Sequence, residues 1–267
     1  FFTHKFPKQL KKKYNVKLIV ALNVIAHVPN LNDVLKGIYN LLNENGIVIF
    51  EFPYLKNLIE KVQFDTIYHE HFSYFSFFSF NKILNANGLK VFNVKQVSSH
   101  GGSLRIYATK KSSTTKVGEL VNNLLKNETK NKINSLEFYD DFKAEIQSIK
   151  IQLRKILLKI NKETENVYGY GAASKCTVLL NLFKINSQFL KGVFDKNKFK
   201  INKLIPGVNV PIIEYKKISK IKPKYIVIFP WNLNNEIIKQ LKFTRKWGCK
   251  LIIFKHKKYI IIWTIYI

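Results

Sequence analysis

The densest group of reactive side chains in the sequence is the run Tyr68-His69-Glu70-His71. Histidine changes its charge near neutral pH and a neighbouring carboxylate tunes its basicity, so this run suits a general base that removes a proton. Two alternatives stay open on spacing alone. His69 and His71 can bind a metal ion together with Glu70, although the sequence lacks a third convincing ligand. The histidines can also be ordinary polar residues where a helix begins.

A second group of polar residues surrounds the Gly101-Gly102 turn, which Ser103 and Arg105 follow. A tight hairpin turn that needs positive φ angles explains the two glycines but does not explain the arginine. We therefore treat these four residues as candidates for binding an anionic substrate.

A third group lies at Gly169 and Gly171, which Ser174 and Lys175 follow. Backbone N–H donors and a cation at the start of a helix form a ready anion site. Asp195 follows Gly171 by 24 residues, a spacing at which an acid can bind the ribose of a nucleotide. Because a lone Gly-X-Gly turn is common, a decayed Rossmann unit without a ligand is the alternative.

The apolar pattern of residues 1–112 predicts part of a doubly wound sheet that would position the first two groups. Residues 17–22 form a continuous apolar run, which is typical of a buried parallel strand. A helical pattern at 31–42 and a second apolar run at 47–53 complete a strand–helix–strand unit. Ligands bind at the carboxyl ends of such strands, the side on which Tyr68-His69-Glu70-His71 is expected. The remaining predicted elements are a helix at 80–87 and an antiparallel pair at 89–97 and 103–109.

Apolar residues then recur at spacings of three and four, which predicts one long amphipathic helix. This helix would connect the two halves of the chain and lie on the face of a domain. A coiled-coil seam between two copies is the sharper alternative, so the choice between monomer and dimer stays open. The stripe consists of Tyr139, Phe142, Ile146, Ile149, Leu153, Ile156 and Ile160.

The last part of the chain again alternates strands and helices, which predicts a second open parallel sheet. Residues 256–267 fit no element. The sequence therefore predicts an α/β protein with two Rossmann-like open-sheet units joined by a long helix. The predicted boundaries are a first domain at 1–112, a connecting helical segment at 113–160 and a second domain at 161–267.

Composition limits the classes of partner. The net charge is +28, which raises nucleic acid as a partner, but only Arg105, Arg154 and Arg245 among the 45 basic residues are arginines. A nucleic-acid groove more often shows arginine clustered with aromatic residues, whereas scattered lysines usually lie on solvated faces. A basic nucleic-acid-binding protein is therefore a weaker hypothesis than an enzyme with an anionic small substrate.

The cysteines and the apolar runs point to a cytoplasmic protein without a membrane span. Cys176 and Cys249 form neither a zinc site by themselves nor a disulfide framework. No apolar run approaches the roughly 20 residues that cross a bilayer. The sequence contains no methionine, so we expect Phe1 not to be the translation start and the chain to be a fragment of a longer protein.

Six blocks of the sequence resemble the sugar-nucleotide C-methyltransferases in order and spacing, over about residues 23–254. The resemblance implies that a methyl group of S-adenosylmethionine is transferred to a ring carbon of a nucleotide-linked keto-deoxysugar. It also implies three parts: a zinc-binding domain, a class I methyltransferase domain and a C-terminal Rossmann-like domain. The most specific blocks are YHEHFSYFS, HGGSLR and GYGAASK, and the others include NVIAHVPN, FDKNKFKINKLIPGVNVPI and PKYIVIFPWN.

The resemblance also assigns roles to individual residues. It implies that His71 is the base, that Glu70 orients it and that Tyr68 lies near the enolate oxygen. His27 would donate to the sugar carbonyl, with a capped loop residue as its alternative role. Residues of the two glycine turns would contact the diphosphate or the nucleotide. Positions next to the cofactor are Leu22 and Asn23.

The departures from the family pattern concern the beginning of the chain. The zinc-binding cysteines, the first strand with its Gly-rich cofactor turn and the acidic strand tip are not in the sequence. We therefore expect the C-terminal part of such an enzyme, with an N-terminally truncated methyltransferase core, zinc only in the missing domain and no useful cofactor affinity of the fragment. A nicotinamide-dependent oxidoreductase using Gly169 and Gly171 is the runner-up enzyme class, disfavoured because no full GxGxxG follows a strand.

Overall fold

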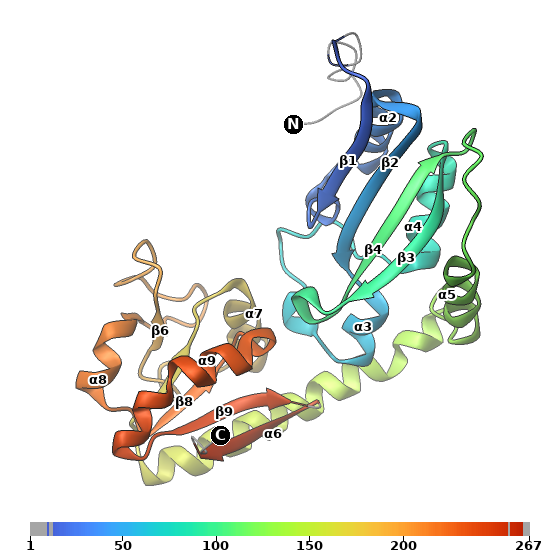
Figure 1. The fold of residues 1–267 in the computed structure, drawn as a ribbon. Coiled ribbons are helices and arrows are strands. Elements are labelled where there is room, and N and C mark those ends of the chain that lie inside the picture. Colours follow the sequence, from blue (N-terminus) through green and yellow to red (C-terminus); the bar gives the residue numbers. More distant parts are fainter. Residues whose placement is uncertain (1–9, 11–12, 256, 264–267) are drawn as a thin grey trace. The chain divides into compact units, whose positions relative to one another are not determined.

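The computed structural model describes residues 10, 13–255 and 257–263. Their contacts divide the chain into an N-terminal unit, residues 1–60 and 69–141, and a C-terminal unit, residues 61–68 and 142–267 (Figure 1). This division differs from the predicted boundaries. Residues 113–160 form no separate segment, because helix α5 (Glu119–Lys130) packs in the N-terminal unit and most of helix α6 (Asp140–Glu163) packs in the C-terminal unit.

The sheet of the N-terminal unit has the order β1-β2-β4-β3. Strands β1 and β2 are parallel, and β2, β4 and β3 pair antiparallel. The predicted strand–helix–strand unit and the terminal antiparallel pair are therefore confirmed. The strands are β1 (Val16–Leu22), β2 (Leu42–Pro53), β3 (Leu89–Val97) and β4 (Ser103–Lys110).

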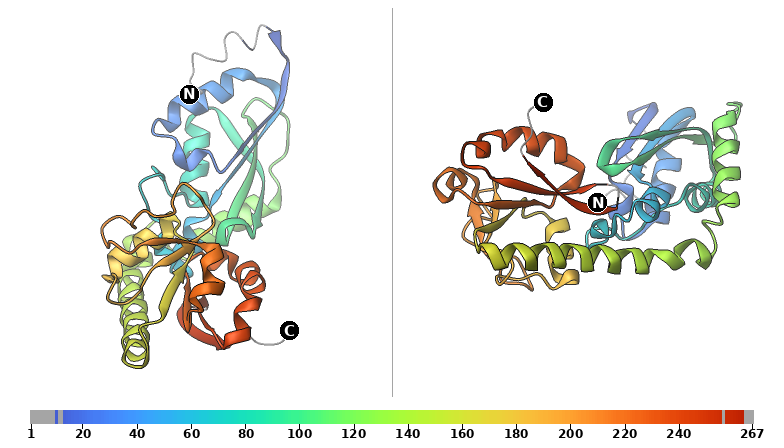
Figure 2. Two further views of the ribbon diagram at one scale, coloured as in Figure 1. Left: turned by 90° about the vertical axis from the view of Figure 1, so that its left-hand side faces the viewer. Right: turned by 90° about the horizontal axis from the view of Figure 1, so that it is seen from below.

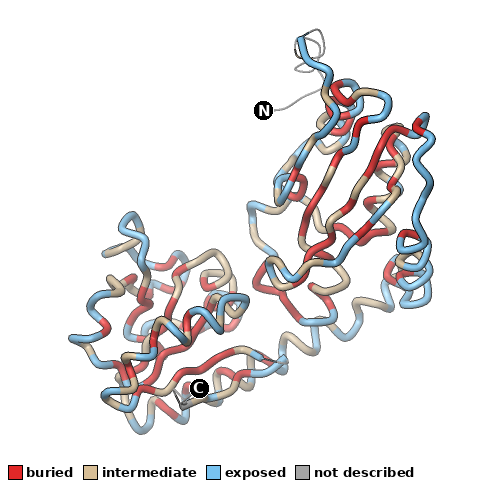
Figure 3. The backbone as a smooth tube through the Cα atoms, viewed as in Figure 1, coloured by how far each residue is buried: buried red, intermediate tan, exposed pale blue. Residues whose placement is uncertain are grey.

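Helices of the N-terminal unit share one apolar core with the sheet. Alternate residues of β2, among them Phe50 and Phe52, are buried with Leu35 of α2 and Phe80 of α4. Figure 3 shows this core as the buried stretches along β2 and β4. On the face of β1 that points away from this core, Leu18 is 56% exposed in the described part of the chain. The helices are α2 (Leu31–Leu41), α3 (Leu55–Glu60), α4 (Phe77–Ala86) and α5 (Glu119–Lys130).

The sheet of the C-terminal unit has the order β10-β9-β8-β5-β6-β7, and all pairs are parallel except β9 with β10. Residues 258–263, for which no element was predicted, form β10; residues 256 and 264–267 lie outside the described part. The strands are β5 (Val167–Tyr170), β6 (Val193–Asp195), β7 (Ile212–Glu214), β8 (Tyr225–Ile228), β9 (Lys250–Lys255) and β10 (Lys258–Trp263).

Helices cover both faces of this second sheet, as Figure 2 shows for α6 and α9. The stripe of α6 buries Ile149, Leu153 and Ile160 against α7 and β5. Because this stripe is covered within the chain, the structure supports the domain-face helix and not the coiled-coil seam. The helices are α6 (Asp140–Glu163), α7 (Ser174–Phe183), α8 (Ile218–Ile221) and α9 (Asn234–Gln240). The predicted α/β class with two open sheets is confirmed.

Candidate active site

The residues after Tyr68 form a loop at the carboxyl end of β1, which we call the site loop (residues 69–76). Its backbone is tied to the short helix η1 (Ile25–His27) that follows β1. The N–H groups of Phe72 and Ser73 both donate to the carbonyl of Ala26, at 2.8 and 3.3 Å. Since Ile25 and Ala26 are buried, η1 gives the site loop a firm support.

The site loop brings three of the predicted catalytic residues together. His27 Nδ1 lies 2.7 Å from the carbonyl oxygen of Glu70. The rings of His27 and His71 are 4.7 Å apart between centroids, and Tyr74 meets His71 edge to face at 5.6 Å. A carbonyl oxygen only accepts, so His27 Nδ1 carries a proton and the lone pair of the neutral ring is on Nε2. Two imidazoles and the backbone carbonyl of Glu70 therefore meet at one strand end.

A buried carboxylate, which the sequence analysis missed, lies at the end of β2. Glu51 accepts from Ser99 Oγ at 2.7 Å and from Arg105 Nε and Nη2 at 2.8 and 2.7 Å. Burial works against its charge, but the hydrogen bonds from Ser99 and Arg105 outweigh it and lower the pKa of Glu51. The only signal in the sequence was an acid inside the otherwise apolar run at 47–53.

The residues around the Gly101-Gly102 turn make contacts that stabilise the local fold. Gly101 and Gly102 have φ angles of 89° and 122°, which side chains rarely adopt. Ser103 is fully buried and donates to the Ser99 carbonyl at 3.0 Å. Arg105, predicted to bind substrate, pairs with Glu51 within the chain, and its contact with a substrate stays a prediction.

The predicted cofactor positions, Leu22 and Asn23, lie where β1 ends beside β2. The Asn23 N–H donates to the Glu51 carbonyl at 2.8 Å. Asn23 adopts a left-handed φ of 54°, uncommon for a residue other than glycine. Its Oδ1 is buried without a hydrogen-bond partner among the described residues. A ligand donor at this strand end would satisfy that oxygen.

The Gly-X-Gly turn of the C-terminal unit uses its polar groups internally. Asp195, the predicted ribose-binding acid, accepts from the N–H of Ala172 at 2.8 Å and from the N–H of Asn197 at 2.7 Å. Lys200 Nζ donates to the Ala172 carbonyl at 2.8 Å. Lys175 lies 4.8 Å from the ring centre of Trp231 and interacts with Asp65. These contacts support a structural role for the turn more than the predicted anion site.

Replacing Gly171 with alanine tests that structural role. The residue has a φ of +88°, and a Cβ would lie 2.6 Å from Pro230 Cδ and closer still to Cγ. We expect a loss of about 2–4 kcal/mol in the free energy of unfolding of the C-terminal unit, measured by urea titration. Gly248→Ala is the matched control, because its φ is +74° but open space surrounds its Cβ. Gly248→Ala should lower the free energy of unfolding by only about 1 kcal/mol. Equal losses in the two variants would contradict a clash between a Cβ at position 171 and Pro230.

Asp65 is a second buried acid that the sequence analysis did not identify. Only 2% of it is exposed, and both carboxylate oxygens accept from Trp231 Nε1, at 3.0 and 2.7 Å. Burial raises its pKa to about 6, although Lys175 and Trp231 act in the opposite direction. Burial also lowers the pKa of Lys175. Cys176 of α7 and Tyr259 of β10 also interact electrostatically with Asp65.

A raised pKa of Asp65 predicts a pH-dependent stability. The folded state holds this proton more tightly than the unfolded state, so stability is highest below about pH 4 for this group and falls as the pH rises to about 6. The decrease should be roughly 2–3 kcal/mol. Asp65→Asn cannot titrate and should lose this slope, measured by denaturant unfolding between about pH 4 and 7. If the stability of the parent protein and of Asp65→Asn changed equally with pH, the pKa of Asp65 would not be raised.

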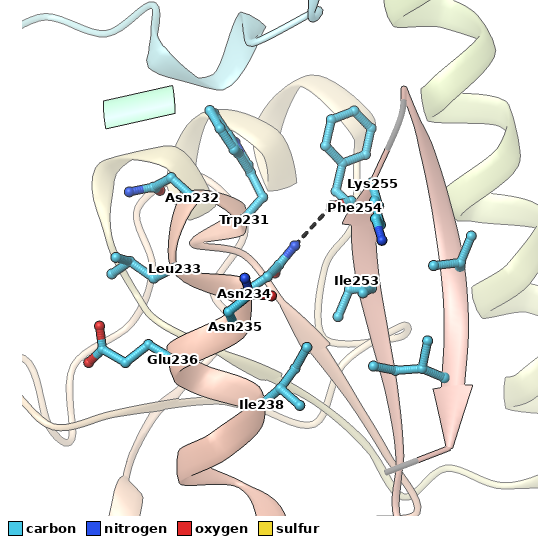
Figure 4. Close-up of a pocket in the computed structure, with 12 residues that line it drawn as sticks. Trp231, Asn232, Leu233, Asn234, Asn235, Glu236, Ile238, Ile253, Phe254 and Lys255 are labelled. Atoms are coloured by element: carbon cyan, nitrogen blue, oxygen red, sulfur yellow. Dashed lines mark hydrogen bonds between the residues drawn. The ribbon is translucent and has the colours of Figure 1, made fainter. Parts of the chain in front are cut away.

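A cavity of about 710 Å³ lies in the C-terminal unit, between η6 (Trp231–Leu233), α9 and strands β9 and β10, and Trp231, the partner of Asp65, is among its lining residues. Figure 4 shows Trp231 and Phe254 at one end and Ile238 and Ile253 further along. Asn234 Nδ2 donates to the Phe254 carbonyl at 2.9 Å. Over the described residues, no group of three His, Cys, Asp or Glu side chains could hold a metal ion, and no helix is suited to cross a membrane.

Comparisons with known proteins show which family the chain resembles. Residues 98–254 match the C-methyltransferase C-terminal domain, and residues 2–94 match a methyltransferase domain. The chain is 30% identical over 253 residues to the C-methyltransferase NovU of Streptomyces niveus, which covers 94% of this chain and 60% of NovU. The chain thus spans about 60% of the length of this curated relative.

Solved structures give only weak matches. A complex of LepI with SAM has a TM-score of 0.31 at 10% identity, covering 36% of this chain and 27% of LepI. Magnesium protoporphyrin IX methyltransferase from Synechocystis PCC 6803, with bound SAH, has a TM-score of 0.28 at 17% identity, covering 38% and 48%. Scores this low establish no shared overall fold.

Proposed function

The chain belongs to the C-methyltransferase family, and from this premise we propose that it is part of an S-adenosylmethionine-dependent enzyme that methylates a carbon atom. The proposed substrate is a nucleotide-diphosphate-linked keto-deoxysugar. The observation that supports it best is the meeting of the His27 and His71 rings, with His27 bound to the backbone carbonyl of Glu70, at the carboxyl end of β1. A sugar carbon becomes a nucleophile only after it loses a proton beside a ketone, and such a site can remove that proton.

In the proposed mechanism His71 takes the proton, while Glu70 orients its ring and Tyr68 stabilises the enolate oxygen. The hydrogen bond of His27 to the Glu70 carbonyl limits how His27 can donate to the substrate. Its Nδ1 hydrogen is used by the Glu70 carbonyl, so Nε2 donates to the sugar carbonyl only when the ring is doubly protonated. The cationic ring would stabilise negative charge on that oxygen.

The cofactor would supply an electrophilic methyl group when bound. Leu22 and Asn23 would hold it, because the unsatisfied Oδ1 of Asn23 suits a donor of the cofactor. The diphosphate would carry the negative charge that the basic composition of the chain favours. The two other hypotheses have less support. Asp195 accepts hydrogen bonds within the chain, which weakens the oxidoreductase hypothesis, and the three arginines are scattered along the sequence, which weakens the nucleic-acid hypothesis.

The proposal is tested in the complete enzyme with methyl-labelled S-adenosylmethionine and nucleotide-linked keto-deoxysugars. We expect label to reach a ring carbon next to the ketone, located by NMR. The same sugar nucleotide with its ketone reduced to an alcohol is the control and should accept no methyl group, because it cannot form an enolate. Label on oxygen, or equal transfer to the alcohol, would reject carbon methylation.

A further inference from the structure

A row of paired residues crosses the sheet of the N-terminal unit near the carboxyl ends of β1 and β2 (Figure 1). In this row Leu22 of β1 pairs with Glu51 of β2, which in turn pairs with Arg105 of β4. Paired residues of neighbouring strands point to the same face of a sheet, and adjacent strands lie about 5 Å apart. The Cα atom of Arg105 is therefore only roughly 10 Å from that of Leu22, which we propose to hold the cofactor.

Glu51 and Arg105 form an ion pair with the acid inside and the cation at the surface. The Glu51 side chain is 5% exposed, whereas the Arg105 side chain is 37% exposed. Oε2 of Glu51 accepts from Nε at 2.8 Å and from Nη2 at 2.7 Å, so the carboxylate uses no donor of Nη1. A guanidinium offers five N–H donors in a rigid fork, and this fork suits phosphate groups. Glu51 thus holds one edge of the fork and leaves the donors of Nη1 for other acceptors.

The second carboxylate oxygen of Glu51 holds the turn that leads into β4. Ser99 Oγ donates to Oε1 at 2.7 Å, and the carbonyl of Ser99 accepts from the N–H of Gly102 at 2.9 Å. Ser103 Oγ donates to the same carbonyl at 3.0 Å. Because both oxygens of the carboxylate are bound, Glu51 cannot rotate without losing these contacts. The orientation that it gives to Arg105 is therefore fixed before any ligand binds.

We propose that Glu51 is a positioning residue for the proposed substrate, because it holds Arg105 in the orientation that binds the diphosphate. This inference rests on the proposed function only for the identity of the ligand. Glu51 does not bind the diphosphate itself, since its carboxylate is buried and would repel a phosphate group. Its effect on the substrate is therefore exerted through the arginine.

Orientation and charge act in opposite directions on this contact. The pair of Glu51 and Arg105 carries no net charge, so Glu51 weakens the attraction of the arginine for an approaching anion. An arginine that is already held in place loses little side-chain freedom on binding, which strengthens the contact. We expect orientation to dominate, because water screens the charge of the partly exposed Arg105, whereas the side-chain entropy of arginine is among the largest of any residue.

Steady-state kinetics of the complete enzyme separate the two effects with two variants. Glu51→Asp keeps the charge but withdraws the carboxylate by one methylene, and we expect KM for the sugar nucleotide to rise by about tenfold with kcat within about twofold. Glu51→Gln removes the charge but keeps the shape and an acceptor, and we expect KM to rise by about threefold. If Glu51 served only to balance charge, Glu51→Asp would leave KM unchanged and Glu51→Gln would lower it. Either result, or a loss confined to kcat, would overturn the proposal.

A double substitution and a second ion pair provide the controls. Arg105→Lys lacks the fork, so adding Glu51→Asp to it should change KM by less than about twofold. A further loss of about tenfold would show general damage to the sheet and would overturn the proposal. Glu44→Asp shortens an acid of β2 that pairs with Lys110 of β4 at 2.8 Å, at the opposite end of the sheet, and should leave KM unchanged.

NMR of the 267-residue chain tests the anion site without any activity, with inorganic pyrophosphate as the probe. The sequence has only three arginines, so each Nε–H signal can be assigned by substitution with lysine. We expect pyrophosphate to shift the Arg105 signal, with a Kd that is about fivefold or more weaker in Glu51→Asp. An Arg105 signal that does not respond in the parent chain would overturn the proposal. If the signal responds as expected but the complete enzyme methylates no carbon, the proposed function fails and the anion site stands.

Discussion

Replacing His71 with alanine is expected to slow proton removal and methyl transfer together by about 10²–10⁴-fold, the usual loss when a general base is removed. The complete enzyme should exchange the hydrogen beside the ketone with deuterium from heavy water even without a methyl donor. That exchange needs only a base and a stabilised enolate, so it separates proton removal from methyl transfer. Mass spectrometry of the recovered sugar nucleotide measures its rate.

Neighbouring residues provide the controls for His71. His69→Ala removes an exposed imidazole two residues away and should change the exchange rate little. Glu70→Gln should cost less than His71→Ala, because it alters the orientation and basicity of the ring without removing it. If His71→Ala exchanges at the parent rate, the base lies elsewhere. His27 is then the first candidate, since the lone pair of its neutral ring is on Nε2.

Local sequence patterns predicted the parts of this fold that depend on neighbouring residues. The alternation around Gly101 predicted the β3–β4 pair, and the stripe from 139 to 160 predicted α6. Boundaries were less accurate. Strand β2 begins at Leu42, directly after α2, and not at residue 47, because Leu42 already pairs with Val16 of β1. Helix α4 begins at Phe77, where Ser76 and Ser79 form a capping box.

Contacts between distant residues were not predictable from any local pattern. The sequence indicated an anion site at Lys175, and the structure places an anion near it, but that anion is Asp65 from more than a hundred residues earlier. Likewise, Arg105 was identified as a binding cation, whereas its partner Glu51 lies on the neighbouring strand. In both cases the residue type was informative, and only the fold shows that the charge is matched within the chain. The roles of the other site residues stay predictions.

Glu128→Ala is expected to be the most destabilising substitution that we predict, at about 3–5 kcal/mol. Glu128 is fully buried on α5 and accepts three hydrogen bonds: from Tyr54 Oη at 2.6 Å, from the N–H of Phe77 at 2.8 Å and from the N–H of Phe78 at 2.6 Å. The last two are free donors of the first turn of α4, which a carboxylate satisfies well. Alanine would leave two buried donors and the half-buried N–H of Phe78 without this acceptor.

One further variant isolates the contribution of Tyr54 to this loss, and another serves as a control. The free energy of unfolding of the N-terminal unit is measured by urea titration. Tyr54→Phe removes one donor and keeps both backbone contacts of Glu128, so it should cost only about 1 kcal/mol. Glu119→Ala removes an exposed acid of the same helix and should change stability by less than about 0.5 kcal/mol. The site loop ends at Ser76, directly before Phe77, so Glu128 also fixes the far end of the segment that carries His71. If Glu128→Ala were as stable as the parent protein, the start of α4 would be satisfied by other groups, and the carboxylate would not hold the site loop.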